Sequence, residues 1–370
     1  MKQGLTSLEI HYLVKELQFL VGGRVDNIYN PEKEEFILQL HVSGKGKQIL
    51  RMISGKLFYL ASWKKPAEAP SGFCMFLRKH LGGARLRGIN QLESERIVEL
   101  LFEKKDGKER LVVELFGKGN ILLCDENNIV LSALVYHKWK DREIRAKFDY
   151  SYPKREYNLF DIKLDELTLL FNKSDKNVVK CLASDLGLGG SYAEEVCLIS
   201  DVDKDKKAID ADEKEIKAIF KVLGNIIETK IKPLIVYDKD EVKDIVPFNL
   251  KVYDKLKVKE FKGYSEAFDD YFLVEFKEEK PKSKQEKEIE RIKRMFETQK
   301  KQIDGLGVKE EKEREKAELI YNNYKLLGDI LSELKKAAEK HSWDEIKERL
   351  KGHKVIKSVN SKEKTIEVEF

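Results

Sequence analysis

Alternating apolar and polar residues dominate the first part of the chain. The stretches EFILQLHV, KQILRMIS and KLFYLA alternate in this way and are separated by SGKGK and SG. This pattern predicts three strands joined by short turns. Four further stretches follow before residue 137, namely RIVELLFE, RLVVELF, NILLCDE and IVLSALVY. Strands that follow one another so closely predict an antiparallel sheet.

Two helical patterns flank these strands. Residues 6–20 carry leucines at helical spacing behind Thr6, and Glu9 stands three places further on. This arrangement is a capping box that opens a helix. The stretch SGFCMFLRKHLGG predicts a shorter helix that ends at Gly82. We therefore expect residues 1–155 to form a β-rich domain flanked by helices.

A helical segment is predicted over residues 156–230. Within it, LASDLGLGGSYAEEVCLI indicates two short helices joined by a glycine turn, a helix-hairpin-helix. Such a turn lets backbone N–H groups approach a phosphate, because glycine has no side chain in the way. The candidate contacts in the turn are Gly187, Gly189 and Gly190. Glu194 and Glu195 argue against this reading, since acids in the first turn of the second helix would repel an anion. A packing hairpin that binds nothing is the alternative.

Residues 231–280 return to strand-like runs with one short helix and are expected to pack back on the first domain. Beyond Pro281 the chain is highly charged and its apolar residues recur in heptads, which predicts a coiled coil over residues 281–340. Gly305 and Gly307 interrupt the pattern, so a helical hairpin that turns there is one reading. Because the heptad register continues past both glycines, we favour one helix about 90 Å long, at about 1.5 Å per residue.

The apolar seam of this helix predicts a partner strand. A weak homodimer through the coil would supply one. Residues 341–370 contain a helical pattern, WDEIKERL, and the start of a hairpin. Because the chain stops inside this element, we expect a fragment whose remainder completes a small domain and returns a second coil strand.

Composition narrows the classes of partner. Charged residues make up 37 % of the chain, but 71 basic residues face 66 acidic ones, so the net charge is only +5 and any basic surface must be local. This excess of charge fits either a heat-adapted protein or a long charged coil. The four cysteines are scattered without metal-ligand spacing, and no stretch reads as a signal peptide or a membrane span. We expect a cytoplasmic protein without a membrane partner.

The sequence predicts no enzymatic chemistry. It contains no G-x-S-x-G, P-loop, dinucleotide-binding or H-E-x-x-H motif. Its six histidines show no paired ligand spacing. We therefore expect neither catalysis nor a cofactor nor a metal site.

Basic residues gather locally instead. One group surrounds the short helix, and another interleaves cations with Tyr136 and Trp139. Charges beside aromatic rings can hold phosphates and stack bases, whereas a solvated face is the alternative in so charged a chain. The candidate nucleic-acid contacts are Arg78, Lys79, Arg85, Lys118, Lys138, Lys140 and Arg142.

The strand RIVELLFE opens on an arginine. Its alternation places Arg96 on the same face as Val98, Leu100 and Phe102. A guanidinium at the start of an apolar face must reach solvent, pair with a carboxylate or be kept for an anionic ligand.

Seven stretches, in order along nearly all of the chain, resemble successive motifs of the NFACT family. They are MKQGLTSLEI, GGRVDNIYNP, FLRKHLGG, INQLESERIVELLF, ELFGKGNILLCD, LGLGGSYAEEV and YSEAFDDYF. The resemblance implies the amino-terminal part of an archaeal-type member, of α+β class. It implies a β-rich domain similar to MutM-type DNA glycosylases, then a helix-hairpin-helix domain, then a long coiled-coil helix.

The resemblance also implies a function in ribosome quality control. Family members bind a large ribosomal subunit obstructed by peptidyl-tRNA. They recruit an aminoacyl-tRNA, here expected to be alanyl-tRNA, so that the ribosome extends the stalled peptide without a template. An acidic residue and an Asp-Arg pair that engage tRNA in the family fall on Glu9, Glu95 and Arg96, with glutamate at both acidic positions. If Arg96 only caps a strand, it would instead pair with Glu9 or Glu95.

Two other functions remain open. A MutM-like DNA-binding or repair protein would use a proline amine at its amino terminus, whereas this chain begins Met1, Lys2, Gln3. A coiled-coil scaffold that binds only proteins would keep its binding to ribosomal subunits at high salt and after removal of tRNA.

Overall fold

The structure is a computed structural model, and it contains two compact units. It describes residues 4–64, 69–105, 107–139, 142–153, 155–278, 284–351, 355–361 and 363–369. The first unit is Met1–Glu278 and the second is Glu279–Phe370. Each unit is a separate body with its own packed residues.

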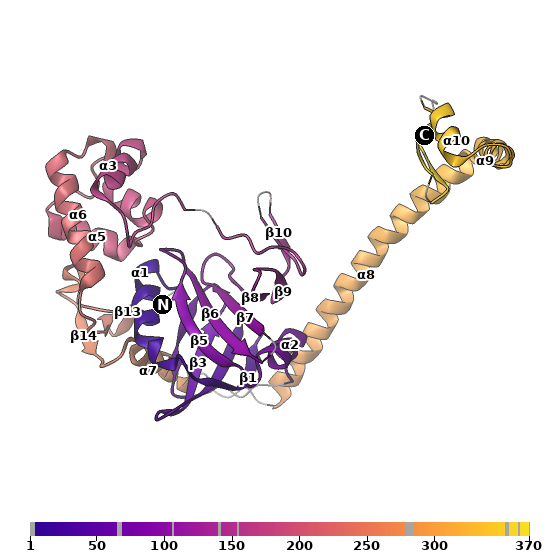
Figure 1. Cartoon of the computed structure of the whole chain (residues 1–370). Helices are drawn as coiled ribbons and strands as arrows, with labels where there is room; N and C mark the ends of the chain where they lie inside the picture. Colours follow the sequence, from indigo (N-terminus) through magenta and orange to yellow (C-terminus); the bar gives the residue numbers. More distant parts are fainter. Residues whose placement is uncertain are drawn as a thin grey trace. The chain divides into compact units, whose positions relative to one another are not determined.

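A nine-stranded antiparallel sheet forms the centre of the first unit (Figure 1). The strands run in the order β4-β3-β2-β1-β5-β6-β7-β8-β9. Their bounds are β1 Arg24–Glu32, β2 Glu35–Val42, β3 Gly46–Ile53, β4 Leu57–Ala61, β5 Arg85–Gln91, β6 Ile97–Lys104, β7 Gly107–Glu114, β8 Asn120–Asp125 and β9 Val130–Ala133. The seven strands predicted from alternation are confirmed. Alternation did not predict β1 and β5, the two strands through which the halves of the sheet meet.

Two helices accompany the sheet. α1 (Ser7–Glu16) carries the predicted capping box, in which the Thr6 side chain accepts from the backbone of Glu9 while the Glu9 side chain accepts from the backbone of Thr6. α2 (Gly72–Leu81) begins at the N-cap Ser71. Both helices bury apolar side chains in the main core of the unit.

Helices fill the part of the unit that follows the sheet. They are α3 Leu164–Lys173, α4 Val178–Lys180, α5 Gly190–Ser200 and α6 Glu213–Glu228, with a π-helical turn at Cys181–Asp185. α1 lies between this group and the sheet (Figure 1). The Tyr12 hydroxyl of α1 donates to the carbonyl oxygen of Ile226 in α6 at 2.6 Å.

A small sheet and a helix complete the first unit. The strands are β12 Leu234–Asp238, β13 Glu241–Val246 and β14 Lys257–Glu260, and the helix is α7 Tyr264–Glu278. α7 packs on β4, where the Leu60 N–H donates to the Ser265 hydroxyl at 3.2 Å. The Glu16 carboxylate of α1 accepts the backbone N–H groups of Tyr264 and Ser265 at the start of α7. The main apolar core therefore takes residues from the large sheet, the helical region and the small sheet, while a second core packs on the other face of the large sheet.

The second unit begins with α8 (Lys284–Asn322), a helix of 39 residues (Figure 1). Gly305 and Gly307 lie inside α8, so the chain does not turn at the glycines. The helix nevertheless ends earlier than predicted, because Asn323 leaves helical geometry with φ −111° and ψ 14°. The expected single helix of about 90 Å is therefore wrong, since 39 residues rise by about 58 Å.

After Asn323 the chain forms a small packed region. Its elements are α9 Tyr324–Ala338, α10 Trp343–Arg349, β15 Ile356–Asn360 and β16 Thr365–Val368. Leu334, which the heptads placed in the coil seam, is buried beside Ile346 and Ile356 in a core of this region. The heptad pattern therefore extends beyond α8 into residues that pack in the core of this small region instead of along a coiled-coil seam.

Candidate nucleic-acid interface

Arg96 lies immediately before β6, at the end of the large sheet where this strand begins. Val98, Leu100 and Phe102 belong to the main core, as the alternation predicted, while Ile97 packs in a second core on the other face. The Arg96 side chain is half-buried, and among the described residues no carboxylate or other acceptor bonds to its guanidinium. Burial and, next, the positive charge of Arg155 lower the pKa of Arg96.

Glu95 is engaged by a different arginine. The Arg155 Nε donates to the Glu95 Oε1 at 2.9 Å, and both side chains are mostly buried. The Arg155 Nη1 also donates to the carbonyl oxygen of Leu186 at 3.1 Å. Among the described residues Glu95 therefore bonds to Arg155 and not to Arg96, although its charge acts to raise the pKa of Arg96.

Glu9 is fully buried. Its Oε2 accepts the Thr6 N–H at 2.8 Å, and its Oε1 accepts the Tyr192 hydroxyl of α5 at 2.8 Å. Burial, followed by the Glu9 carboxylate, raises the pKa of Tyr192 well above its ordinary value. A direct contact between Glu9 and a bound nucleotide does not fit this burial, and neither does a pair between Glu9 and Arg96. Glu9 instead fixes α1 to α5.

The glycine turn before α5 packs on the same residues. Gly187 and Gly189 have positive φ values of 81° and 92°, which favour glycine. A Cβ at Gly187 would stand 1.6 Å from the Arg155 Nη1, and one at Gly189 would stand 2.6 Å from the Thr6 Cγ2. These two glycines therefore allow the turn to approach the protein's own side chains. A Cβ at Gly190 would meet open space.

The acids after this turn do not oppose an anion as predicted. α5 begins at Gly190, so Glu194 and Glu195 lie beyond its first turn. Glu194 pairs with Lys204 at 3.1 Å. The buried Glu195 carboxylate accepts two backbone N–H groups at the start of the short helix Lys251–Tyr253.

A glutamine ties these parts together. The Gln91 Nε2 donates to the carbonyl oxygens of Ser7 and Glu95, each at 2.9 Å. The start of α1, the turn that carries Glu95 and Arg96, and the glycine turn thus form one site. Within it, Arg96 is the residue with an available charge.

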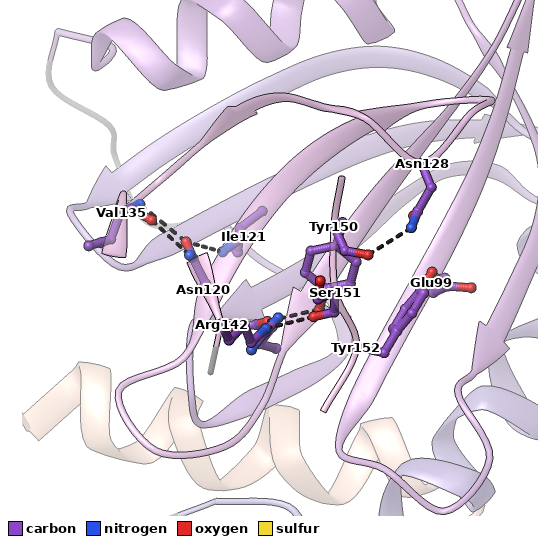
Figure 2. Close-up of polar contacts among 10 residues, drawn as sticks. Glu99, Asn120, Ile121, Asn128, Val135, Arg142, Tyr150, Ser151 and Tyr152 are labelled. Atoms are coloured by element: carbon purple, nitrogen blue, oxygen red, sulfur yellow. Dashed lines mark hydrogen bonds and ion pairs between the residues drawn. The ribbon is translucent and has the colours of Figure 1, made fainter. Parts of the chain in front are cut away.

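Arg142 is built into the fold, contrary to its prediction as a nucleic-acid contact. Its Nε donates to the carbonyl oxygen of Ser151 at 2.7 Å, and its Nη2 pairs with the buried Glu114 carboxylate. Its guanidinium also lies over the ring of Tyr150, and Figure 2 shows Arg142 pointing toward Ser151. Because only 14 % of the Arg142 side chain is exposed, it holds the segment after β9 to the sheet.

The neighbouring two-stranded sheet of β10 (His137–Lys138) and β11 (Glu143–Ile144) is more open. Lys138 is 78 % exposed and lies 3.8 Å from Glu143, a loose ion pair. The Trp139 ring is exposed and stacks on His137. Lys140 lies outside the described residues.

The remaining candidates are not gathered around Arg96. The Arg78 Nε donates to the carbonyl oxygen of Ile28 at 2.7 Å, so this guanidinium is partly used by the backbone. Lys79, Lys118 and Arg85 are exposed on separate elements. Arg85 lies opposite Glu103, at the other end of β6 from Arg96.

Two overlapping pockets of about 440 and 570 Å³ lie at that other end of β6. Both are lined by Glu103 and Glu109 as well as Lys108, so their charges are mixed. Neither pocket includes Arg96.

Among the described residues, no helix is both long enough and apolar enough to cross a membrane.

Arg155 and Tyr192 are the site residues that sequence reasoning missed. Arg155 is 60 residues from Glu95, and Tyr192 is 183 residues from Glu9. No spacing rule connects residues so far apart. The sequence shows Tyr192 as an aromatic residue after the predicted glycine turn, but it does not indicate that Glu9 is the partner of its hydroxyl.

Comparison with known proteins places the chain in a family. Residues 6–367 match the family described as NFACT N-terminal and middle domains. The chain is 36 % identical over 377 residues to the archaeal Rqc2 homolog aRqcH of Methanocaldococcus jannaschii, covering 96 % of this chain and 55 % of that protein. It is 25 % identical over 384 residues to the human ribosome quality control complex subunit NEMF, covering 94 % of this chain and 35 % of NEMF.

A solved structure shares the fold. The fibrinogen binding protein from Staphylococcus aureus matches with a TM-score of 0.62 at 20 % identity, over 72 % of this chain and 98 % of that one. The chain spans only about half the length of its archaeal relative. On the family match and the archaeal relative together, the chain belongs to the NFACT family.

Proposed function

We propose that this chain is an RNA-binding part of a ribosome quality-control factor that acts in the cytoplasm. It binds tRNA and ribosomal RNA on a large ribosomal subunit obstructed by peptidyl-tRNA. It recruits an aminoacyl-tRNA, with alanyl-tRNA as the expected species, for extension of the stalled peptide without a template. The names of relatives that match 94 to 96 % of the chain support a role in ribosome quality control.

The half-buried Arg96 without a carboxylate is the observation that carries the RNA-binding part of this proposal. Partial burial of a guanidinium costs free energy, and here the charge of the adjacent Glu95 offsets that cost only in part, since burial and Arg155 together still lower the pKa of Arg96. A phosphate would supply the missing charge and accept a bidentate hydrogen bond. Arg96 therefore suits an anionic ligand that arrives from solvent.

Glu9 and Glu95 act indirectly in this proposal. Glu95 holds Arg155, and Glu9 holds α5 against α1. Both acids thereby keep the turn that carries Arg96 in place. This role tolerates glutamate at both positions, provided that each carboxylate reaches its present partner.

In this proposal the chain performs no bond-making step. The ribosome forms the peptide bond, and the chain selects and positions the tRNA. The proposed work of Arg96 is therefore binding, and no residue is assigned as a nucleophile or general base.

The finer architecture is also proposed rather than established. We propose a MutM-like domain over residues 1–155, a helix-hairpin-helix over residues 156–230 and a coiled-coil seam along α8. Apolar side chains at heptad spacing on α8 are exposed and support the seam; they are Ile292, Phe296, Ile303, Leu306 and Ile320. An exposed seam of this kind would allow weak self-association.

Titration of labelled tRNA at fixed salt tests the function. Arg96→Ala is expected to weaken binding about tenfold or more, since a hydrogen bond to a charged group contributes about 1.5–3 kcal/mol. Arg314→Ala is the matched control, because Arg314 is exposed on α8 and pairs with Glu318 four residues away.

Unchanged tRNA binding by Arg96→Ala would remove the site assignment. Binding to obstructed large subunits that persists at high salt and without tRNA would instead favour a protein-binding scaffold. Excision of oxidised bases from DNA above background would favour a MutM-like repair enzyme.

A further inference from the structure

A row of basic side chains crosses four neighbouring strands at one end of the large sheet. Lys47 of β3 lies opposite His41 of β2, His41 lies opposite Arg24 of β1, and Arg24 lies opposite Arg85 of β5. Directly opposite residues of antiparallel strands project from the same face. All four side chains are exposed. We refer to Lys47, His41, Arg24 and Arg85 as the cationic row.

The core on the opposite face fixes the direction of the row. Val25, Leu40 and Leu86 are next to row residues in the chain and are buried in the main core. A slip of one residue in any of these strands would expose the core and bury a cation. Because neighbouring strands lie about 4.8 Å apart, the row extends for about 15 Å.

The cations of the row have no carboxylate partners among the described residues. The Arg85 Nη1 donates to the carbonyl oxygen of Gly22 at 3.2 Å. The Arg24 guanidinium lies against Gly83, whose added Cβ would stand 3.3 Å from the Arg24 Nη2. Backbone contacts rather than acids therefore position both guanidinium groups.

Two acidic residues lie close to the row and have partners outside it. Glu103 lies opposite Arg85, where the row ends, and its carboxylate accepts from Arg87 at 2.6 Å. Asp26 follows Arg24 by two residues and accepts from the Gln39 side chain. Arg87 offsets the charge of Glu103, whereas the partner of Asp26 is an uncharged amide, so Asp26 remains an acid beside Arg24.

The row is unfavourable for the isolated protein. Arg24 and Arg85 are like charges directly opposite one another on antiparallel strands, and such a pair destabilises a sheet. A line of phosphates would relieve the repulsion, and lysine and arginine bind a nucleic-acid backbone without reading its sequence.

We propose that the cationic row is a second RNA-contact surface, which binds the phosphate backbone irrespective of sequence. Arg85 lies opposite Glu103, and Glu103 is seven residues after Arg96. The two surfaces are therefore separated by about 24 Å along β6. The inference rests on the proposed function in taking RNA as the ligand. It does not require Arg96 to contact the same RNA segment.

A charge-matched pair of triple variants tests the row. In the row variant, glutamine replaces the three cations: Lys47→Gln, Arg24→Gln and Arg85→Gln. In the control variant, it replaces three exposed lysines on and after α6: Lys214→Gln, Lys221→Gln and Lys230→Gln. Binding of fluorescein-labelled single-stranded RNA is measured between about 50 and 200 mM salt.

The row variant is expected to bind at least about tenfold more weakly at the lower salt. The negative slope of log K against log salt should become shallower by about 2, since each lost phosphate contact on a single strand removes about 0.7 from its magnitude. The control variant should keep the wild-type slope. Equal losses in both variants, or no loss in the row variant, would overturn the proposal.

Arg96→Ala in the same titration separates this inference from the proposed function. If only Arg96→Ala weakens binding, the row proposal fails and the proposed tRNA site stands. If only the row variant weakens binding, the row stands and the Arg96 site fails. Labelled polyglutamate that binds as tightly as RNA, and loses affinity in the row variant, would assign the row to an acidic protein and overturn the RNA proposal.

Thermal unfolding at low salt provides a second measurement. Removing the three cations should leave the unfolding midpoint of the row variant equal to or above that of the wild type, because like-charge repulsion is removed. A clearly lower midpoint would contradict the repulsion argument and with it the proposal.

Discussion

Arg155 donates to Glu95 at 2.9 Å, and among the described residues the adjacent Arg96 has no carboxylate bonded to it. The Arg155 side chain also contacts the carbonyl oxygen of Leu186 at the glycine turn. One arginine thus supports the position of another. Arg155 is a positioning residue for the proposed RNA site.

Arg155→Ala is expected to weaken tRNA binding to about the same extent as Arg96→Ala. Without Arg155, the Glu95 carboxylate becomes available to neutralise Arg96. The measurement is a double-mutant cycle by tRNA titration, in which the double variant should bind no more weakly than either single variant. Additive losses would instead mean that Arg155 contacts the RNA itself.

Glu9→Ala is expected to destabilise the first unit by about 3 kcal/mol. The substitution leaves the buried Tyr192 hydroxyl and the Thr6 N–H without their acceptor and opens a cavity. Denaturant unfolding measures the loss. Glu126→Ala is the control, because Glu126 is exposed, and it should change the free energy of unfolding by less than about 0.5 kcal/mol. An unaltered stability in Glu9→Ala would refute the anchoring role.

Gly187→Ala is expected to cost more than about 1 kcal/mol in stability and to disturb the Arg155–Glu95 pair. The new Cβ would stand 1.6 Å from the Arg155 Nη1, and φ at this position is 81°. Gly190→Ala is the matched control, since its Cβ would enter open space. Unfolding midpoints and tRNA affinities of the two variants should therefore diverge. Similar values in both would show that the close approach at Gly187 is unimportant.

His11 makes stability depend on pH. Its ring stacks on Phe160, and burial, followed by Lys15, lowers the pKa of His11 from 6.5 to about 4. The unfolded chain therefore binds a proton at higher pH than the folded chain does. Stability should be complete above about pH 6.5 and should fall as the pH drops towards 4.

His11→Phe tests this dependence because phenylalanine keeps the stacking and cannot titrate. The fall in the unfolding midpoint between neutral pH and about pH 5 should be smaller in His11→Phe than in the wild type. His137→Phe is the control, because His137 is an exposed histidine whose ring stacks on Trp139, and it should follow the wild type. An identical fall in His11→Phe would assign the acid sensitivity to other groups.

Local patterns predicted the elements whose side chains alternate clearly. The strand at Glu35–Val42 was fully visible because four of its residues are large and apolar. β1 was missed because it carries Asp26, Asn27 and Asn30 and has irregular pairing, so its pattern is masked by polar residues. β5 was missed for a similar reason, with a register shift near Gly88.

Long-range contacts explain the remaining differences. Arg96 was correctly singled out as an unusual residue at the start of an apolar face, but its lack of a partner depends on Arg155, which no local pattern connects to it. The end of α8 was misplaced for a related reason. Leu334 fits a heptad and also fits the small core around Ile346, and tertiary packing selects the second.

The polar side chains of α1 limit how the chain can be divided for experiments. Glu9, Tyr12 and Glu16 find their partners at Tyr192, Ile226 and the start of α7. A fragment cut near residue 155 would expose a row of unsatisfied groups along α1 and would be prone to aggregate. A recombinant piece that ends at about residue 278, where the first compact unit ends, retains every one of these contacts.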